Sequence, residues 1–348
     1  MVRVTFWSEL HVQLGTPVTF ALGPYGIQEM NQVLRNVNGA GVAGGASWFN
    51  ATVEVVTGTL VYPYASIYDN GTNDPFVVTP LAQLSPSSRL GGIVRTPGKN
   101  GTNWRSDVVI YNPSARTRNV NVGFSYVSSA YSTARLTYSV NVSIGAGQSL
   151  ETVDVVKSVL PVSPGVDGSL PSALFAYMDV KPASDDPLPT EPLLVLGKTY
   201  NETLQGSVGT LLLPVTPLDA LTATGKNRRL ILSGLSESPS SATGKRTNIA
   251  VLRATNDGNG ASATIRVLNP QGIQIGTQPF SLGDPTAVNT FLQFAVKEIL
   301  DAAGFGGDRT SLTVVIDGYS GTAPVVAYAT VVDNVTSDSA FILGVPVP

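Results

Sequence analysis

Two short acidic stretches, "DNGTND" (69–74) and "DNVTSD" (333–338), carry the residue types that bind calcium. Calcium prefers loops rich in carboxylate and carbonyl oxygens. A third stretch of the same form, "YNETLQG" (200–206), has Tyr200 where the other two have their first aspartate. A calcium site is therefore not maintained in every copy. The candidate ligands are the aspartates of the first two stretches: Asp69, Asp74, Asp333 and Asp338.

Six asparagines stand in the N-x-Ser/Thr pattern that accepts N-linked glycans. Three of them fall at corresponding places in the three stretches, which points to glycosylation at a repeated position. Turn chemistry is the competing interpretation, because Asn and Asp favour tight turns by hydrogen-bonding their own backbone. The six candidate glycosylation sites are Asn50, Asn70, Asn100, Asn141, Asn201 and Asn334.

Groups that could perform catalysis are scarce. His11 is the only histidine, and a Ser-His-Asp triad would have to use it. "GAGVAG" (39–44) matches a dinucleotide-binding motif, but here a helix is expected before it and a strand after it, the reverse order. Asp185, Asp186 and Glu191 lie in a proline-rich loop, where we expect solvated turn residues instead of a glycosidase pair. We therefore expect no enzyme activity, no catalytic residue and no cofactor.

The composition of the 348 residues describes a packed protein with short strands. Hydrophobic residues make up 43 %, and 35 glycines and 24 prolines favour turns. A formal net charge of −3 argues against nucleic acid as a partner. No apolar run approaches the 18 residues that span a membrane, so we expect no membrane span. The absence of cysteine excludes disulfides and thiolate metal sites.

The asparagine phrases recur at a nearly constant spacing. Asn70, Asn201 and Asn334 are 131 and 133 residues apart, and the segments between them keep one order. Repetition at a fixed period indicates one folding unit used several times. The sequence therefore predicts three tandem repeats, at residues 1–85, 86–217 and 218–348.

Each repeat is predicted to be all-β, an antiparallel sandwich of immunoglobulin-like size with about seven strands. One short helix per repeat is expected where apolar residues recur at helical spacing, at 27–37, 150–160 and 289–300. Because helices long enough for βαβ crossovers are missing, a parallel sheet is not expected.

The first repeat is incomplete in this alignment. Residues 2–7 and 17–22 match the third and fourth strands of the later repeats, and the first two strands have no counterpart. Such a sandwich exposes unpaired backbone and apolar core. Three explanations stay open: the chain belongs to a longer precursor, its start is misplaced, or another subunit completes the sheet.

Four segments carry a recognisable pattern: "RSDVVIYNPSARTRNVNVGF" (105–124), "LETVDVVKSVL" (150–160), "KTYNET" (198–203) and "AYATVVDNVTSDSAFI" (327–342). They resemble segments of a class of secreted bacterial tandem β-sandwich proteins whose members are largely uncharacterised. In that class an Arg-Thr-Asp/Asn-Leu strand opens each repeat and a Val-Val-Asp-Asn-x-Thr phrase closes it. The resemblance covers most of residues 86–348 and, weakly, 1–85. It implies an extracellular or cell-surface location and supplies no catalytic residue.

These observations lead to a structural role as the first expectation. The chain is expected to be a subunit of an extracellular filament, sheath or surface stalk whose partners are copies of itself. The alternative is an adhesin or carbohydrate-binding stalk that recognises a surface glycan, with Trp7, Trp48 or Trp104 stacking on the sugar.

Overall fold

The computed structural model describes most of the 348 residues. The residues outside the description are 25, 32, 34–48, 69–71, 73, 80–84, 98–102, 129–134, 160–173, 204–205, 217–218, 223–227, 241, 257, 285–289 and 308. The described chain is built of antiparallel sheets with two short helices, as the all-β prediction required. Within the described part, no helix combines the length and the apolar character needed to cross a bilayer.

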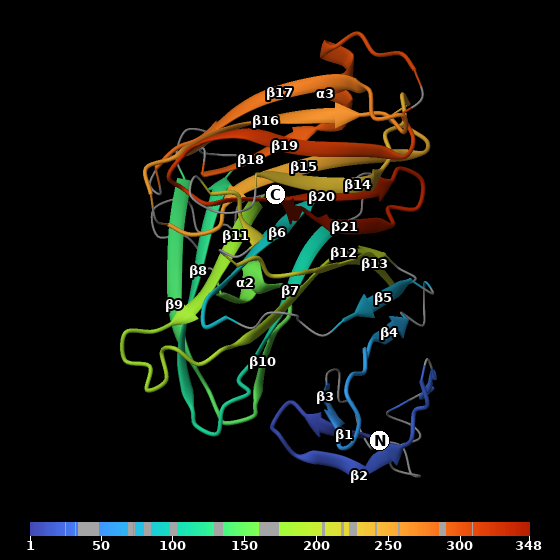
Figure 1. Cartoon of the computed structure of the whole chain (residues 1–348). Helices are drawn as coiled ribbons and strands as arrows, with labels where there is room; N and C mark the ends of the chain where they lie inside the picture. Colours follow the sequence, from blue (N-terminus) through green and yellow to red (C-terminus); the bar gives the residue numbers. More distant parts are fainter. Residues whose placement is uncertain are drawn as a thin grey trace.

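The second segment (86–217) consists of two sheet layers around one core (Figure 1). One layer has the order β9-β8-β11-β6, and the other has β13-β12-β7 with β10 on the free side of β7. A short contact between β6 and β7 joins the layers at one end. The elements are β6 (Ser88–Pro97), β7 (Asn103–Tyr111), β8 (Arg118–Ser128), β9 (Arg135–Ile144), β10 (Ser149–Thr152), α2 (Val155–Val159), β11 (Leu174–Pro182), β12 (Leu194–Thr203) and β13 (Gly206–Leu212).

The third segment (218–348) repeats this pairing strand for strand. Its layers are β17-β16-β19-β14 and β18-β15-β20-β21, with β22 added beside β14. One apolar cluster fills the space between the two layers. The elements are β14 (Arg229–Leu235), β15 (Lys245–Arg253), β16 (Ala261–Leu268), β17 (Gln274–Leu282), β18 (Phe291–Ala295), α3 (Val296–Ala302), β19 (Leu312–Gly321), β20 (Val325–Asp333), β21 (Ser339–Leu343) and β22 (Val345–Val347).

The strand order differs from that of an immunoglobulin domain, so that part of the prediction is wrong. In immunoglobulin domains the first two strands are neighbours in one sheet. Here the first strand, β6 or β14, lies beside β11 or β19, and the second strand, β7 or β15, lies in the opposite layer. The first two strands therefore complete one layer each.

A glycine bulge sits at the same place in both first strands. The pairing of β6 with β11 shifts register between Leu90 and Ile93, and Gly92 there has a φ of 80°. The pairing of β14 with β19 shifts in the same way at Gly234, with a φ of 77°. Side chains rarely adopt such a φ, so glycine is required at both bulges.

The end of the second strand is also built alike in the two segments. Asn112 follows β7, and its side-chain amide donates to the backbone oxygens of Ile144 (3.0 Å) and Gly145 (2.9 Å). Arg253 ends β15 and donates from Nη1 to the backbone oxygen of Gly283 (2.7 Å). Both side chains are fully buried. Each one satisfies carbonyl groups in the loop after the fourth strand, which would otherwise be costly to bury.

The first segment (1–85) contains two smaller sheets whose pairings also occur in the other segments. Its three-stranded sheet, β2-β1-β3, has the order of β9-β8-β11, and its hairpin β4-β5 has the order of β12-β13. Among the described residues of the segment, no strand lies beside the outer edges of β3 and β4. The elements are β1 (Val2–Ser8), β2 (Gln13–Phe20), β3 (Phe49–Val55), β4 (Ala65–Tyr68) and β5 (Pro75–Val78).

Two of the three expected helices are present, but each is shorter than predicted and follows a short strand. Residues 150–160 and 289–300 each begin with a short strand, β10 or β18, and only then form α2 or α3. The helical spacing of the apolar residues did not reveal that the first part of each range is a strand. Because of these added strands, the second and third segments have more strands than the seven predicted. Residues 27–31 of the first segment are not helical, and most of the rest of 27–37 lies outside the described residues.

The second and third segments share a packed contact. Arg89 is almost fully buried there, and it binds the Asp179 carboxylate (2.5 and 2.7 Å) and Asn256 Oδ1 (2.9 Å). Its guanidinium lies 4.1 Å from the centre of the Tyr177 ring. Nearby, the Tyr328 ring packs directly on the backbone of Gly91. A buried ion pair and a ring against glycine fix how these two segments meet.

We predict that Gly91→Ala loosens this contact, because the added Cβ would collide with the Tyr328 ring. Overpacking of this kind destabilises by about 1–3 kcal/mol. Denaturant unfolding measures the loss, and Gly306→Ala, where nothing lies near the added Cβ, is the matched control. Equal stability of the two variants would contradict the contact as described.

Candidate functional site

Strands from three hairpins, each next to one of the asparagine phrases, come together at β13 of the second segment. The phrases fall in or beside the hairpins β4-β5, β12-β13 and β20-β21, and both β5 and β21 lie against β13. Across this junction the N–H of Phe341 donates to Thr210 Oγ1 (3.0 Å), and Thr72 Oγ1 donates to the backbone oxygen of Ser207 (2.8 Å). The junction therefore joins all three segments.

The junction brings two of the predicted calcium ligands together. Asp74 is buried and accepts the N–H of Gly209 (2.8 Å). Burial raises the pKa of Asp74, the N–H of Gly209 lowers it, and the adjacent Asp338 carboxyl raises it again. The ammonium group of Lys198 also lies near and favours the charged form. The net result is a carboxyl with a raised pKa where the first segment docks.

The other two calcium candidates do not join them. Asp333 closes the β20-β21 turn by accepting the N–H groups of Val335 (2.8 Å) and Thr336 (3.0 Å), and these bonds lower its pKa. Asp69 lies outside the described residues. Within the described part of the chain, no group of three His, Asp or Glu side chains is placed to hold a metal ion.

Tyr200, which stands where the other two phrases have their first aspartate, contributes a hydrogen bond that joins strands of the fold. Tyr200 Oη donates to Asp107 Oδ1 (3.1 Å), which also accepts the N–H of Asp154 (2.9 Å). Burial raises the pKa of Asp107, although both hydrogen bonds lower it. Tyr200 thus ties β12 to β7 and to the start of α2.

The glycosylation candidates differ in accessibility. Asn141 is exposed and accepts from Asn121 (2.7 Å), and half-buried Asn50 donates to Ser149 Oγ (2.7 Å). Asn334 is buried and accepts from Arg246 Nη1 (2.6 Å). Asn201 is fully buried, and neither polar atom of its amide has a partner among the described residues. Burial leaves no room for a glycan on Asn201 or Asn334, and Asn70 and Asn100 lie outside the described residues.

The strand pairings show that Asn201 corresponds to Asp333, one residue before the Asn334 with which the sequence alignment had matched it. Trp104 of β7 lies opposite Asn201, whereas the corresponding Lys245 of β15 lies opposite Asp333. The correspondence of β7 with β15 follows from their core residues, Val108 with Ile249 and Ile110 with Val251. Asn201 and Asn334 therefore occupy neighbouring positions of the hairpin and not the same one.

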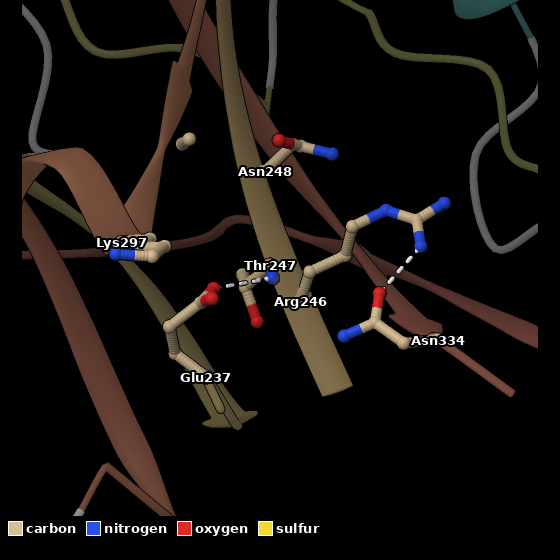
Figure 2. A pocket seen from close by; sticks show the side chains of 7 residues that line it. Glu237, Arg246, Thr247, Asn248, Lys297 and Asn334 are labelled. Atoms are coloured by element: carbon tan, nitrogen blue, oxygen red, sulfur yellow. Dashed lines mark hydrogen bonds between the residues drawn. The ribbon is translucent and has the colours of Figure 1, made fainter. Parts of the chain in front are cut away.

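A small cavity of about 120 Å³ opens beside β15 in the third segment, and most of the residues that line it are polar or charged (Figure 2). Buried Glu237 accepts the N–H of Thr247 (2.7 Å) on one side, and Arg246 binds Asn334 on the other. Burial raises the pKa of Glu237 and lowers the pKa of Arg246. Ordinary ligand pockets have roughly 300–1,000 Å³. This cavity has room for a few water molecules.

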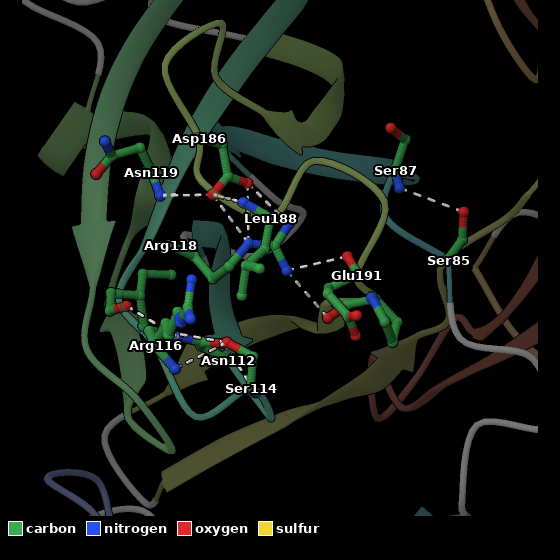
Figure 3. Close-up of polar contacts among 12 residues, drawn as sticks. Ser85, Ser87, Asn112, Ser114, Arg116, Arg118, Asn119, Asp186, Leu188 and Glu191 are labelled. Atoms are coloured by element: carbon green, nitrogen blue, oxygen red, sulfur yellow. Dashed lines mark hydrogen bonds and ion pairs between the residues drawn. The ribbon is translucent and has the colours of Figure 1, made fainter.

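One carboxylate of the proline-rich loop, that of Asp186, has a structural role (Figure 3). Arg118, fully buried at the start of β8, donates from Nε to both oxygens of Asp186 (2.8 and 3.1 Å) and from Nη1 to the backbone oxygen of Glu191 (2.9 Å). Burial raises the pKa of Asp186, but Arg118 and the N–H groups of Leu188 and Asn119 lower it on balance. The expectation of a solvated turn residue is wrong for Asp186.

His11 lies in the turn after β1, with a φ of 61°. Its ring stacks on Trp7 with the ring centres 4.5 Å apart, and it packs against Gly147 of the second segment. On the second-segment side of this contact, the N–H of Ser149 donates to the backbone oxygen of Glu9 (2.9 Å). His11 thus helps to seat the first sheet against the second segment.

Comparison with known proteins assigns no family. No family model and no curated protein matches the chain. Two crystal structures of a glycosyl hydrolase family 2 member from Bacteroides cellulosilyticus are similar at 11 % and 9 % identity, over 70 % and 91 % of this chain. The chain spans 28 % and 33 % of the length of those proteins. The TM-score is 0.16 in both cases, so the likeness assigns neither fold nor function.

We predict that docking of the β4-β5 hairpin weakens as the pH rises. Asp74 has a raised pKa in the folded chain, so its contribution is complete at low pH and is lost as the pH rises through that pKa. Asp74→Asn stays uncharged and keeps an acceptor for Gly209, so its docking should not vary with pH in this way.

The measurement is hydrogen exchange of β5 between pH 4 and pH 8, corrected for the intrinsic rate. Asp185→Asn, on an exposed carboxylate, is the control and should behave like the unchanged chain. If Asp74→Asn and the unchanged chain showed the same pH profile, the titration of Asp74 would not be the cause of the pH dependence.

Proposed function

We propose that the chain is a structural subunit of an extracellular filament, sheath or surface stalk. In this proposal the three segments are tandem β-sandwich repeats, and the first, incomplete repeat is completed or covered by a neighbouring subunit. Copies of the chain assemble through the open sheet edges of that repeat.

The observation that carries the proposal is the contrast between strands in equivalent positions. All four residues of β4 are exposed, whereas seven of the nine residues of its counterpart β20 are buried. Twelve of the seventeen exposed large hydrophobic side chains in the described part of the chain belong to residues 1–79. An apolar surface of this kind on a folded chain favours association.

Two further features support a structural role. The buried contact around Arg89 and Tyr328 holds the second and third segments together, as a load-transmitting stalk requires. Two of the carboxylates that sequence reasoning considered for chemistry, Asp186 and Asp333, are occupied in hydrogen bonds within the fold.

Sedimentation and electron microscopy of the purified 36.3 kDa chain test self-assembly directly. We predict fibres or sheets that form above a critical concentration. Ile67→Asp, on exposed β4, should raise that concentration about tenfold or more, because burying an isoleucine contributes ~1.5–3 kcal/mol. Ile273→Asp, on an exposed turn of the third segment, is the control. If the chain stayed a monodisperse, unassembled particle at every concentration, the proposal would be rejected.

A carbohydrate-binding stalk is the second candidate, and one surface feature favours it. Half-buried Trp104 borders a surface hollow of about 80 Å³ together with Arg95, Asn103 and Arg105. The hollow is too small to enclose a sugar, so a sugar would stack on the outer face of the ring. An aromatic ring flanked by hydrogen-bond donors is suited to stacking on a sugar.

Glycan-array binding tests this candidate. If the stalk binds sugars at this hollow, Trp104→Ala should abolish binding while Trp7→Ala, whose ring stacks on His11, retains it. Absence of binding by the unchanged chain, or equal binding by both variants, would reject the candidate.

A further inference from the structure

The outer edge of β9 lacks the features that protect the equivalent edges of the other two segments. β9 has the same place in its layer as β2 in the first segment and β17 in the third (Figure 1). β2 contains Gly15 and Pro17, β17 contains Gly276 and Pro279, and both strands pair with their neighbours across a shift of register. β9 contains neither glycine nor proline, and all ten of its residues pair with β8 without a shift.

These differences leave β9 able to pair with a further strand. Proline, bulges and charges are the means by which proteins close the edges of sheets. When the core residues of β8 and β16 are matched, Ser139 of β9 stands where β17 has Pro279, so it keeps an N–H that the proline lacks. Among the described residues, no strand pairs with the outer edge of β9. A long strand edge of this kind is a template for another strand.

The apolar side of β9 is also incompletely covered. The residues of β17 that correspond to Val140 and Val142 are Phe280 and Leu282, and both are buried. Helix α3 lies against β17, whereas α2 lies against β7 and β6. A strand added beside β9 would therefore cover apolar surface as well as backbone. The inward side chains of β9 that pack on the core but stay half-buried are Leu136, Tyr138, Val140 and Val142.

The strand that already pairs with β9 shows what kind of strand fits it. β8 carries Asn-Val-Asn-Val (119–122), and β9 carries the similar Val-Asn-Val-Ser (140–143). On their shared polar face, Asn121 Nδ2 donates to Asn141 Oδ1 (2.7 Å), and Ser143 Oγ donates to Asn119 Oδ1 (2.8 Å). Because β9 has the pattern of its own partner, a second β9 offers the same polar groups on one face and the same apolar residues on the other. Cross-strand pairs of this kind stabilise sheets.

The charges favour an antiparallel arrangement of two β9 strands. Arg135, the only charged residue of β9, is its first residue. Parallel copies would place two arginines side by side, which is unfavourable, whereas antiparallel copies place them at opposite ends. At the far end of β9 lies exposed Asp185, which accepts from Asn119 Nδ2 (3.2 Å), and the same side chain accepts from Ser143. The antiparallel pair thus brings the basic end of each strand toward the acidic end of its partner.

We propose that a second copy of the chain adds its β9 to this edge, antiparallel about Ser139, so that the layers β9-β8-β11-β6 of two copies form one continuous sheet. This contact lies in the second segment and uses none of the first-segment edges of the proposed function. The two contacts are therefore independent. A symmetric contact alone gives a dimer, and a second, separate contact lets dimers join into an open array.

Cross-linking tests the contact cleanly, because the chain has no native cysteine. Ser139→Cys places one thiol at the middle of β9, and Ser281→Cys places one at an exposed position of β17 as the control. A short bis-maleimide should join Ser139→Cys chains into covalent dimers in about tenfold higher yield than the control, because paired strands lie about 4.8 Å apart. Equal yields from the two variants would overturn the inference.

The third segment supplies the substitution that should close the edge. Ser139→Pro copies Pro279, which β17 carries at the same position without losing its pairing with β16. It should raise the dissociation constant of the dimer about tenfold or more in sedimentation equilibrium, because proline removes a donor from the edge. Pro279→Ser leaves β9 unchanged and is the matched control.

A second substitution keeps the test decisive if Ser139→Pro does not fold. Ser139→Lys would place two like charges opposite each other at the centre of the paired strands, which is destabilising. It should weaken the dimer as Ser139→Pro does, and the effect should shrink at high salt. An unchanged dissociation constant in either folded variant would contradict the contact.

The variant Ile67→Asp separates this inference from the proposed function, because it acts on the first segment alone. Chains with Ile67→Asp should still form dimers, and Ser139→Pro should dissociate them. Assembly that depends on Ile67 and not on Ser139 would overturn the β9 contact and leave the proposed function standing. Dimers through β9 in a chain that never forms fibres would support the contact and reject the filament.

Discussion

The pairing of the first strand holds a complete segment together. β6 pairs with β11 along its length and also receives the returning chain at Val215, and β14 pairs in the same way with β19 and β22. The first strand therefore links the strand after the helix to the end of the segment. A buried backbone edge without such a partner is costly.

The described residues of the first segment contain no strand paired in this way. Its sheet β2-β1-β3 keeps a small core around Val2, Val4 and Phe6, but its hairpin β4-β5 is held elsewhere, against β13. Phe76 and Asp74 anchor the hairpin there. The two halves of the unit are thus both present and both seated on the second segment.

The sequence was sufficient to predict the all-β class and most strand positions, because these depend on local alternation of apolar and polar residues. It could not predict which strands become neighbours, so the immunoglobulin order was wrong. Asp186 was misjudged because its partner, Arg118, is distant in the chain. The approach of Asp74 to Asp338 and the alignment of Asn201 with Asp333 likewise depend on the packing of segments.

The central claim is that β3 and β4 are unfinished edges that a neighbour completes. A high-resolution electron cryomicroscopy map of the assembled material tests it most directly. The account predicts continuous density for one additional strand at hydrogen-bonding distance, about 4.8 Å, from β3 and another from β4. An assembled form in which solvent or side chains alone face both edges would contradict it.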